Sequence, residues 1–529
     1  MTDDTLALPQ DGKVLLDPTS IACCVAVCIA QSAIAIPSTL NGLFQSNLHT
    51  TGSQLSWISS ATLMPVALLG LTFAALGDLF GRKQLLAGGG VVLAAGEAVS
   101  AMSHGAPAMI AGQALAGIGA AAVMPSSLAM IATRARTPRQ RATAIAAWSA
   151  FLAGGGFVAP ALGGITGQHG SWRAAFVILT VLGLVAALVA LTARNSSSRH
   201  GRSLDVPGQL TVGLGLFALL YAVIQGPTDG WSSLPVVTGF AVGAVLLPLF
   251  VVAELSSPAP LLNLSLFRNR SFAVAAVVAV IGMFSFVGTV YALSIRLGPI
   301  QHQNPGRAGI AFLFTNGPTL LLAPLSARLL QRVSARYLLS AGFLVIAAGD
   351  VLLARLPIAD RALPSLIVPL VLVGLGITLA LSSITASAVN AVPARLEGMA
   401  SGATSQLRDF GFMLGPAVVG AVALSQAANA FRTALAAAPL PPDAIAAAGQ
   451  IAAQGGPLAV NSLPPGSPPG AAAGLAFQAL GDGYATGFLI CGAAALLSSL
   501  LAAFVLRGRS KAEVALEADQ AGESAMAEA

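Results

Sequence analysis

The feature that most limits how this chain can fold is an apolar run of about 20 residues that recurs from near its beginning almost to its end. A helix of that length crosses a hydrocarbon core about 30 Å thick. Only 9% of the 529 residues are charged, whereas soluble domains carry about 25%. We therefore predict an all-α membrane protein with about fourteen transmembrane helices. The predicted spans are residues 19–43, 55–77, 84–103, 107–132, 142–166, 172–193, 206–226, 235–254, 272–294, 309–330, 337–355, 363–391, 398–425 and 484–506.

Lysine and arginine residues are concentrated in alternate loops, and this bias predicts the orientation of the chain. Residues 134–141 hold four arginines and residues 194–202 hold three. Because basic loops stay on the cytoplasmic side, we expect a multi-pass protein of the cell inner membrane with cytoplasmic tails at 1–18 and 507–529. Topology then accounts for the net charge of +6. We expect membrane lipid and a small-molecule substrate as partners, no nucleic acid, and a monomer.

Parts of the amino-terminal sequence reappear in the carboxyl-terminal sequence. "GRKQLLAGGGVVLAAGEAV" at 81–99 aligns with "SARYLLSAGFLVIAAGDVL" at 334–352, and "GGFVAPALGG" around Pro160 aligns with "GFMLGPAVVG" around Pro416. This predicts two duplicated six-helix halves with two helices inserted between them. The predicted parts are the halves at 19–193 and 272–506, the inserted helices at 206–254, and a flexible external loop rich in Ala, Pro and Gly at 426–483.

Several short motifs resemble those of the major facilitator superfamily. "GDLFGRK" at 77–83 resembles its loop signature, in which an acid is followed by Gly and then by two basic residues. "GGGFVAPALGG" resembles its antiporter motif, and "SWRAAF" at 171–176 resembles the sixth span of its fourteen-span drug:proton antiporter (multidrug efflux) branch. "LDVPGQL", "DGW" and "LFRNRSF" resemble the joints around the two inserted spans of that branch.

This resemblance covers nearly the whole chain below Arg507 and implies the major-facilitator fold, with substrate held between the halves. It implies a secondary transporter, not an enzyme, that exports a small amphipathic or apolar drug or metabolite in exchange for protons by alternating access. Two departures concern the coupling, because Cys28 and Gln113 stand where the branch usually has an acid and an arginine. An uncoupled or substrate-specific carrier and a transporter-like ligand sensor therefore remain as alternatives.

The sequence favours neither a cofactor nor a metal site. Glycine-rich stretches such as "GIGAAA" lie inside apolar spans without a preceding strand, so they are not nucleotide motifs. All five histidines fall between the predicted spans. Without an ATP site, we expect transport to be driven by an ion gradient, with protons as the expected ion, or by the substrate's own gradient.

The polar loop after the second span is a candidate gate, formed by Asp78, Gly81, Arg82 and Lys83. A carboxylate is stabilised at the positive amino-terminal end of a helix. We expect Asp78 to dock against the thirteenth predicted span near 398–401 and to latch the outward-facing state. The plainer alternative is that Arg82 and Lys83 only follow the positive-inside rule, which leaves the acid unexplained.

Small residues repeat at equivalent places in the fifth and thirteenth spans. Such residues allow helices to approach closely and to kink. We expect them to seal the two halves against each other, with generic helix packing as the alternative. The candidates are Gly155, Pro160, Gly163, Gly164, Gly411, Gly415 and Pro416.

Four charged residues inside spans are candidates for coupling. Glu97 and Asp350 occupy equivalent positions, and we expect both carboxyl groups to lie at the periphery and to reach toward the outer interface. Arg408 lies near mid-membrane and needs a partner. Its neighbour Asp409 is not expected to face it, because adjacent residues on a helix point apart. A structural ion pair competes with a coupling role, and we favour Asp409 as the group that exchanges a proton.

Four amides in spans are candidates for substrate binding: Gln31, Gln113, Asn316 and Gln406. Neutral amides among apolar neighbours suit a largely apolar ligand with a few hydrogen-bonding groups. Hydrogen bonds between helices are an equally good explanation.

The predicted topology can be tested with reporter fusions. A reporter after residue 200 is expected inside, and one after residue 460 outside, because an odd number of predicted spans separates them. Alkaline phosphatase activity and fluorescent-protein folding report the two sides. Both reporters on one side would contradict the predicted number of spans.

Overall fold

The computed structural model describes residues 17–134, 137–195, 205–258, 260–393, 396–464 and 466–506. All secondary structure in these ranges is helical, and fourteen of the helices are long and apolar enough to cross a membrane. The predicted all-α fold is therefore confirmed. The predicted tails, apart from Asp17 and Pro18, lie outside the described residues, as do Arg136, Arg199 and Arg202 of the basic loops.

The helices fall into three groups along the chain. The amino-terminal half consists of α1 (Pro18–Ala35), α2 (Pro37–Leu48), α3 (Gly52–Phe80), α4 (Arg82–Ala101), α5 (Ala106–Arg134), α6 (Pro138–His169) and α7 (Trp172–Ala190). The inserted pair is α8 (Val206–Asp229) and α9 (Leu234–Ser256). The carboxyl-terminal half consists of η2 (Leu264–Arg268), α10 (Arg270–Ile295), η3 (Arg296–Ile300), α11 (Pro305–Arg332), α12 (Ala335–Arg355), α13 (Leu363–Val389), α14 (Glu397–Ala437), α15 (Pro442–Asn461), η5 (Pro469–Ala472) and α16 (Ala473–Phe504).

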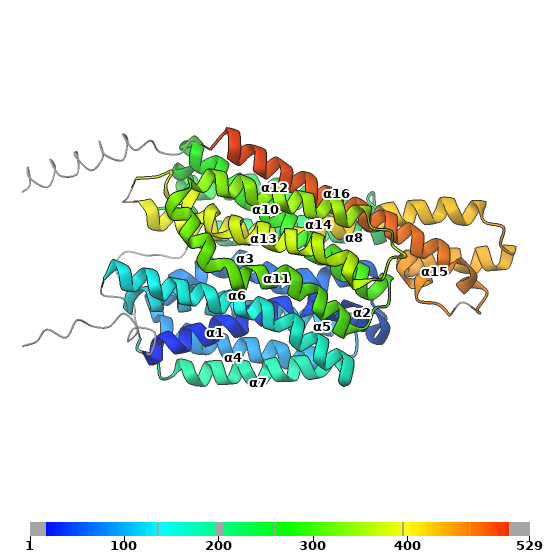
Figure 1. The fold of residues 1–529 in the computed structure, drawn as a ribbon, viewed down its shortest axis with the longest axis horizontal. Helices are drawn as coiled ribbons and strands as arrows, with labels where there is room; N and C mark the ends of the chain where they lie inside the picture. The colour runs from blue at the N-terminus through cyan, green and yellow to red at the C-terminus, as the bar shows by residue number, and fades with distance from the viewer. Residues whose placement is uncertain are drawn as a thin grey trace, which may run out of the picture.

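The long helices run side by side along the long axis of the molecule (Figure 1). Both ends of the described chain lie at the left of that view, and we name this the termini end. The hairpin that contains α15 projects at the opposite end, which we name the α15 end. Two chain ends on one side agree with an even number of spans.

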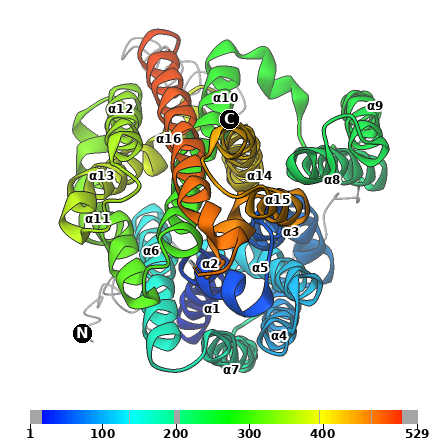
Figure 2. The same cartoon turned by 90° about the vertical axis from the view of Figure 1, so that its right-hand side faces the viewer.

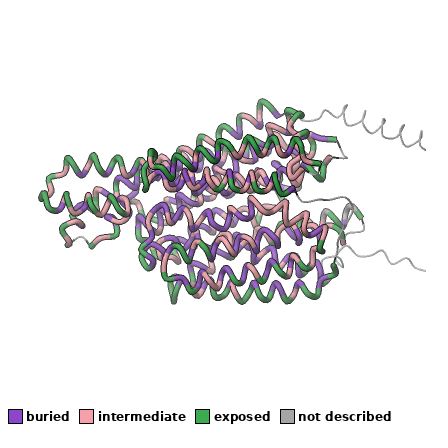
Figure 3. Tube along the Cα trace, turned by 180° about the vertical axis from the view of Figure 1, so that it is seen from behind, coloured by how far each residue is buried: buried purple, intermediate pink, exposed green. Residues whose placement is uncertain are grey.

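The outer faces of the bundle are apolar and exposed, whereas buried residues follow its interior (Figure 3). On α9, for example, Val245 and Leu255 are 65% and 72% exposed. In water such faces would be costly, because each exposed apolar side chain forgoes about 1.5–3 kcal/mol of burial. Lipid is the solvent that suits them.

The first predicted span is divided in the structure. α1 ends at Ala35, and Pro37 begins the separate helix α2. Proline lacks the backbone N–H that would continue the helix, but it is well suited to a first helical position. The second piece, α2, therefore lies at the α15 end, where it can contact the other half.

The expectation of a flexible loop over 426–483 is wrong. α14 continues to Ala437, α15 occupies the middle of the segment, and α16 already begins at Ala473. Alanine has the highest helix propensity, so a run rich in alanine forms helices even where proline and glycine separate them. What remains irregular is the short connection on either side of α15.

The inserted pair lies beside α3 and α14, at the side of the bundle (Figure 2). Polar contacts join α8 to α3 at both of its ends. Near the termini end, Gln209 Nε2 donates to the carbonyl of Leu68 at 2.9 Å. Near the α15 end, Trp57 Nε1 donates to Gln225 Oε1 at 3.3 Å. The inserted helices are thus attached to the amino-terminal half by hydrogen bonds.

The sequence repeat corresponds to a repeated contact. A Cβ atom on Gly96 of α4 would lie 2.6 Å from the carbonyl oxygen of Gly112 in α5. A Cβ atom on the equivalent Gly349 of α12 would lie 2.8 Å from the carbonyl oxygen of Pro369 in α13. Real Cβ atoms do not approach backbone so closely, so each half needs glycine here to bring these helices together.

Substitution of one glycine tests this close approach. Gly96→Ala is expected to lower the apparent melting temperature in detergent, because overpacking costs about 1–3 kcal/mol. Gly88→Ala, on the same helix, is the matched control, since its added methyl group meets nothing within 4 Å. The control is expected to be neutral or slightly stabilising. Equal melting of the two variants would contradict the contact between α4 and α5.

Candidate functional site

The two halves meet along a seam formed by two helix pairs, α6 with α11 and α3 with α14. The α6–α11 contact depends on small residues. A Cβ atom on Gly309 would lie 2.6 Å from the carbonyl oxygen of Pro160, and one on Gly164 would lie 3.2 Å from that of Pro305. Pro160 and Gly164 of the predicted sealing set therefore do lie between the halves.

Other members of that set pack inside their own half. A Cβ atom on Gly155 would lie 2.3 Å from the carbonyl oxygen of Cys28 in α1, and one on Gly415 would lie 2.7 Å from the backbone nitrogen of Gly288 in α10. Gly163 likewise faces Thr39 of its own half. The small residues therefore serve packing within a half at some positions and packing across the seam at others.

Hydrogen bonds across the seam are concentrated at the α15 end. Asn41 Nδ2 of α2 donates to Ser294 Oγ of α10 at 2.8 Å. The hydroxyl groups of Ser56 in α3 and Tyr291 in α10 are 2.7 Å apart, and both side chains are buried. Further hydrogen bonds join the halves at this end, from Gln45 to Ser462 and to the carbonyl oxygen of Leu458, and from Ser294 to the carbonyl oxygen of Ser38. The α15 end is therefore sealed.

At the termini end of the seam, the two halves are in contact over fewer residues than at the α15 end. Gln406 of α14 reaches α3, where its Oε1 atom would lie 3.0 Å from a Cβ atom on Gly70. Nearer the end, a Cβ atom on Gly398 or Gly402 would meet nothing within 4 Å. The face of these amino-terminal turns that carries Gly398 and Gly402 is therefore uncovered in this state, whereas Ala400 and Ala403 are buried on another face.

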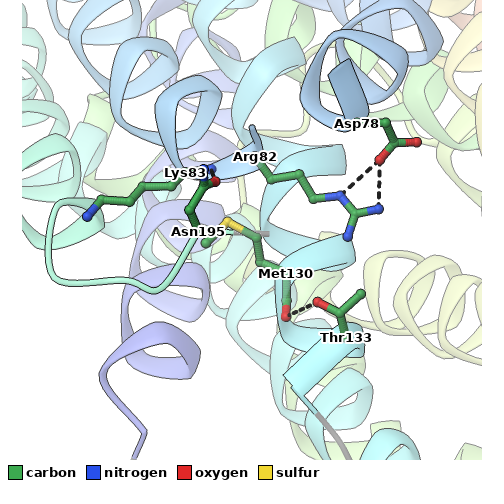
Figure 4. A network of polar contacts seen from close by, with 6 residues as sticks. All are labelled: Asp78, Arg82, Lys83, Met130, Thr133 and Asn195. Atoms are coloured by element: carbon green, nitrogen blue, oxygen red, sulfur yellow. Dashed lines mark hydrogen bonds and ion pairs between the residues drawn. The ribbon is translucent and has the colours of Figure 1, made fainter. Parts of the chain in front are cut away.

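The loop between α3 and α4 forms a compact polar knot (Figure 4). Arg82 donates to Asp78 Oδ1 through Nη2 at 2.7 Å and through Nε at 3.1 Å. The backbone of Gly81 has φ 107°, which glycine adopts without strain. The side chain of Lys83 points away from the pair, while its backbone N–H donates to Asn195 Oδ1 at 3.2 Å.

Asp78 is buried and pairs with Arg82 within its own half, and the turn at Gly398 has open space beside it. Gly81, Arg82 and Lys83 lie around the same turn (Figure 4). The docking of Asp78 on α14 stays a prediction.

Arg408 and Asp409 form an ion pair in α14, with Arg408 Nε 3.5 Å from Asp409 Oδ1. The expectation that these neighbours would not face each other is wrong, because long side chains can bend together where the helix surface is not packed. Their side chains remain 22% and 19% exposed, and the Arg408 guanidinium lies 5.9 Å from the centre of the Phe412 ring. The pair is accessible to solvent or to a ligand.

The expectation that Glu97 and Asp350 reach the outer interface is also wrong. Both residues are fully buried, because the glycines beside them let neighbouring helices close over them. Asp350 Oδ1 accepts a hydrogen bond from Thr289 Oγ1 at 2.7 Å. Among the described residues, neither carboxyl oxygen of Glu97 accepts a hydrogen bond of normal geometry, and the Gln113 amide is the polar group that interacts with this carboxyl. Duplicated acids therefore have unequal surroundings.

The four candidate amides are divided between different places. Gln31 of α1 and Asn316 of α11 approach the same turn of α6 from the two halves, at Gly155 and Gly156. Gln406 lines a small, mainly apolar pocket between α3, α8, α9 and α14.

For Gln113 the structure agrees with the second explanation, hydrogen bonds between helices, because its amide is used inside the amino-terminal half. Thr62 Oγ1 donates to Gln113 Oε1, and Gln113 Nε2 donates to Ser100 Oγ, both at 2.9 Å. Its side chain is fully buried. This structure therefore gives Gln113 a helix-joining role, while Gln31 and Asn316 keep their place as substrate candidates.

Sequence reasoning missed the residues that seal the α15 end. Asn41, Gln45, Tyr291 and Asn461 are all buried polar residues. The available signal was the position of Asn41 and Gln45 just after Pro37, where the first span breaks. Nothing in the sequence pairs them with residues more than two hundred positions away.

Comparisons with known proteins agree with this architecture. A family model described as Major Facilitator Superfamily matches residues 21–416. The tetracenomycin C resistance and export protein of Streptomyces glaucescens is 29% identical over 520 residues, which cover 96% of this chain and 95% of that protein. A multidrug resistance protein of Mycobacterium tuberculosis (strain CDC 1551 / Oshkosh) is 31% identical over 369 residues, 70% of this chain and 68% of that protein.

The solved structures that resemble it are transporters. A bacterial homolog to the human lysosomal transporter Spinster superposes with a TM-score of 0.65 at 15% identity, over 96% of this chain and 99% of that one. At this identity the likeness concerns the fold alone, and it agrees with the two halves described above. With a family model matched over most of its length, this chain belongs to the major facilitator superfamily.

Proposed function

We propose that this protein exports small amphipathic or apolar compounds from the cell, in exchange for protons, by alternating access. The observation that carries the proposal is the asymmetry of the seam. Hydrogen bonds between the halves lie at the α15 end, whereas one face of α14 is uncovered at the termini end. One sealed and one uncovered end is the arrangement expected of a carrier whose halves rock about a central site.

Relatives support export as the direction of transport. The tetracenomycin C protein is named for resistance and export, and a relative in Bacillus subtilis, 27% identical over 72% of this chain, is a methylenomycin A resistance protein. The concentration of arginine in the loops at the termini end supports a cytoplasmic position for that end. In this reading the structure is the cytoplasm-facing state, which accepts substrate.

We assign Asp78 to the outward-facing state. When the halves rock, the uncovered amino-terminal turn of α14 approaches the loop that carries Asp78 and Arg82. The positive end of α14 then competes with Arg82 for the carboxylate. Because the contact forms in one state only, it shifts the balance between the two states.

Removal of the charge tests the latch. Asp78→Asn is expected to cut export about tenfold, as follows from losing a charge–dipole contact of about 1–2 kcal/mol. Asp443→Asn is the matched control, an exposed acid in the first turn of α15 at the opposite end. The measurement is efflux from cells at equal amounts of inserted protein. Full activity of Asp78→Asn would contradict the latch and would leave the basic residues of this loop with a role in membrane orientation only.

For coupling, the structure favours Asp409 over the buried acids. A coupling group must bind a proton and release it to water on the other side. Asp409 is partly exposed and has Arg408 as its counter-ion, whereas Glu97 and Asp350 are closed off within their own halves. Protonation of Asp409 would remove the counter-ion of Arg408. The positive charge of Arg408 would then be available to attract another negatively charged or polar group.

The choice of carboxylate is testable in inverted vesicles. One pH unit supplies about 1.36 kcal/mol per proton, which permits roughly tenfold accumulation. Gradient-driven uptake is expected in the wild type and in Glu97→Gln, and is expected to disappear in Asp409→Asn. Uptake that survives in Asp409→Asn and vanishes in Glu97→Gln would assign coupling to the other acid.

An uncoupled carrier is the second candidate function, and the place of Gln113 favours it. Where the branch usually has an arginine, this chain has a neutral amide bonded to Thr62 and Ser100. Uptake in the wild type that does not respond to the gradient would support the uncoupled carrier. Counterflow of labelled substrate separates either carrier from a ligand sensor, because a sensor cannot exchange label across the membrane.

A further inference from the structure

Gly456 interrupts α15 close to its end. Its backbone, at φ 71° and ψ −179°, is not helical, and its positive φ favours glycine. Pro457 follows directly and begins a separate turn. We name residues 457–462 the bolt. Figure 2 shows α15 in front of the place where α2, α3 and α14 meet.

The bolt is bound firmly to the carboxyl-terminal half. Asn461 Nδ2 donates to the carbonyl oxygens of Ile300 at 3.1 Å and of Pro299 at 3.3 Å, and it lies 3.3 Å from His302 Nε2. Val460 is fully buried in an apolar cluster with Phe431 of α14 and neighbouring residues of α16. Both ends of the bolt also continue into helices of this half.

One side chain binds the bolt to the amino-terminal half. Gln45 Nε2 of α2 donates to Ser462 Oγ at 2.7 Å and to the carbonyl oxygen of Leu458 at 3.2 Å. Gln45 is only 7% exposed. These hydrogen bonds connect α2 to a segment that is held, through Asn461, on η3.

The bolt thus reinforces a contact that must break during transport. α2 and η3 touch directly, since a Cβ atom on Gly42 would lie 2.8 Å from the Cα atom of Gly298. For substrate to leave at the α15 end, α2 and η3 have to separate. The bolt can follow only one of them.

We propose that residues 457–462 gate the exit, moving with the carboxyl-terminal half and releasing Gln45 each time the exit opens. The proposal rests on alternating access. Three contacts of Asn461, the burial of Val460 and the chain itself hold the bolt on its own half. On the other side it has the two hydrogen bonds of Gln45 and the packing of Leu458 in the main apolar core, which carries no directional bond. Gly456 is the place where the backbone can absorb the change.

A reversible cross-link tests the gate. Gln45→Cys and Ser462→Cys are combined in a full-length chain whose native cysteines, Cys23, Cys24, Cys28 and Cys491, are replaced by alanine. Ethidium efflux from energised cells is measured after oxidation and again after reduction. Oxidation is expected to abolish efflux, and reduction is expected to restore it.

A cross-link inside one half is the matched control. Ser340→Cys with Ser499→Cys joins α12 to α16 within the carboxyl-terminal half, where the hydroxyl groups are 3.0 Å apart. Efflux is expected to survive oxidation of this pair. If the Gln45–Ser462 disulfide forms completely and efflux continues, the bolt does not gate the exit. The wild type and the reduced variants can also fail to export ethidium although the disulfide still forms. In that case ethidium is not a substrate, and the proposed gate is judged by the thiol-labelling measurement described next.

A single substitution provides a test that needs no transport. Gln45→Ala removes the two hydrogen bonds that join α2 of the amino-terminal half to the bolt. The reporter is Ser56→Cys, a buried position within the seal, in the chain whose four native cysteines are replaced by alanine. Adding Gln45→Ala to this reporter is expected to make it react at least about fivefold faster with a membrane-impermeant thiol reagent added on the α15 side. Unchanged labelling would overturn the proposal.

Discussion

The close approach of α6 and α11 is the contact on which the rest of the structure depends. Gly164 and Gly309 carry no side chains there, so the two backbones meet directly. In a bilayer, helices do not associate by excluding water, and van der Waals contact with a few hydrogen bonds must hold them. A contact made of backbone and small residues has few interlocking side chains. In the proposed transport cycle, this contact is where the halves pivot while the hydrogen bonds at the α15 end form or break.

The same requirement shapes each half and explains where the buried acids lie. Gly96 and Gly349 bring α4 and α12 against their neighbours, and the acid that follows each glycine is enclosed as a result. An acid in hydrocarbon is costly unless protein surrounds it. The surroundings then differ, since Asp350 accepts a hydrogen bond from Thr289, whereas neither carboxyl oxygen of Glu97 accepts one of normal geometry among the described residues. A duplicated position in the sequence does not ensure duplicated chemistry.

The structure shows which of the candidate residues lie close together, and several of their contacts differ from those expected from the sequence. Asp78 and Arg82 are adjacent, and Pro160 and Gly164 lie on the seam. Arg408 and Asp409 proved to be paired, and Gln113 proved to be used within its own half. These differences share a cause, because the partner of a polar side chain depends on which helix face meets it. Periodicity within one helix carries no information about that face.

By itself, the sequence determined the number of spans and the duplication of the halves, because both follow from the length of apolar runs and from local similarity. It also determined where helices break, at Pro37 for instance, although the alanine-rich segment around α15 was misjudged. Only the tertiary structure decided which end of the seam is closed and by which residues. Gln45 and Ser462 are distant in the chain and neither belongs to a motif. Their contact exists because α2 and the bolt are carried to the same end by different helices, and this depends on the packing of the whole bundle.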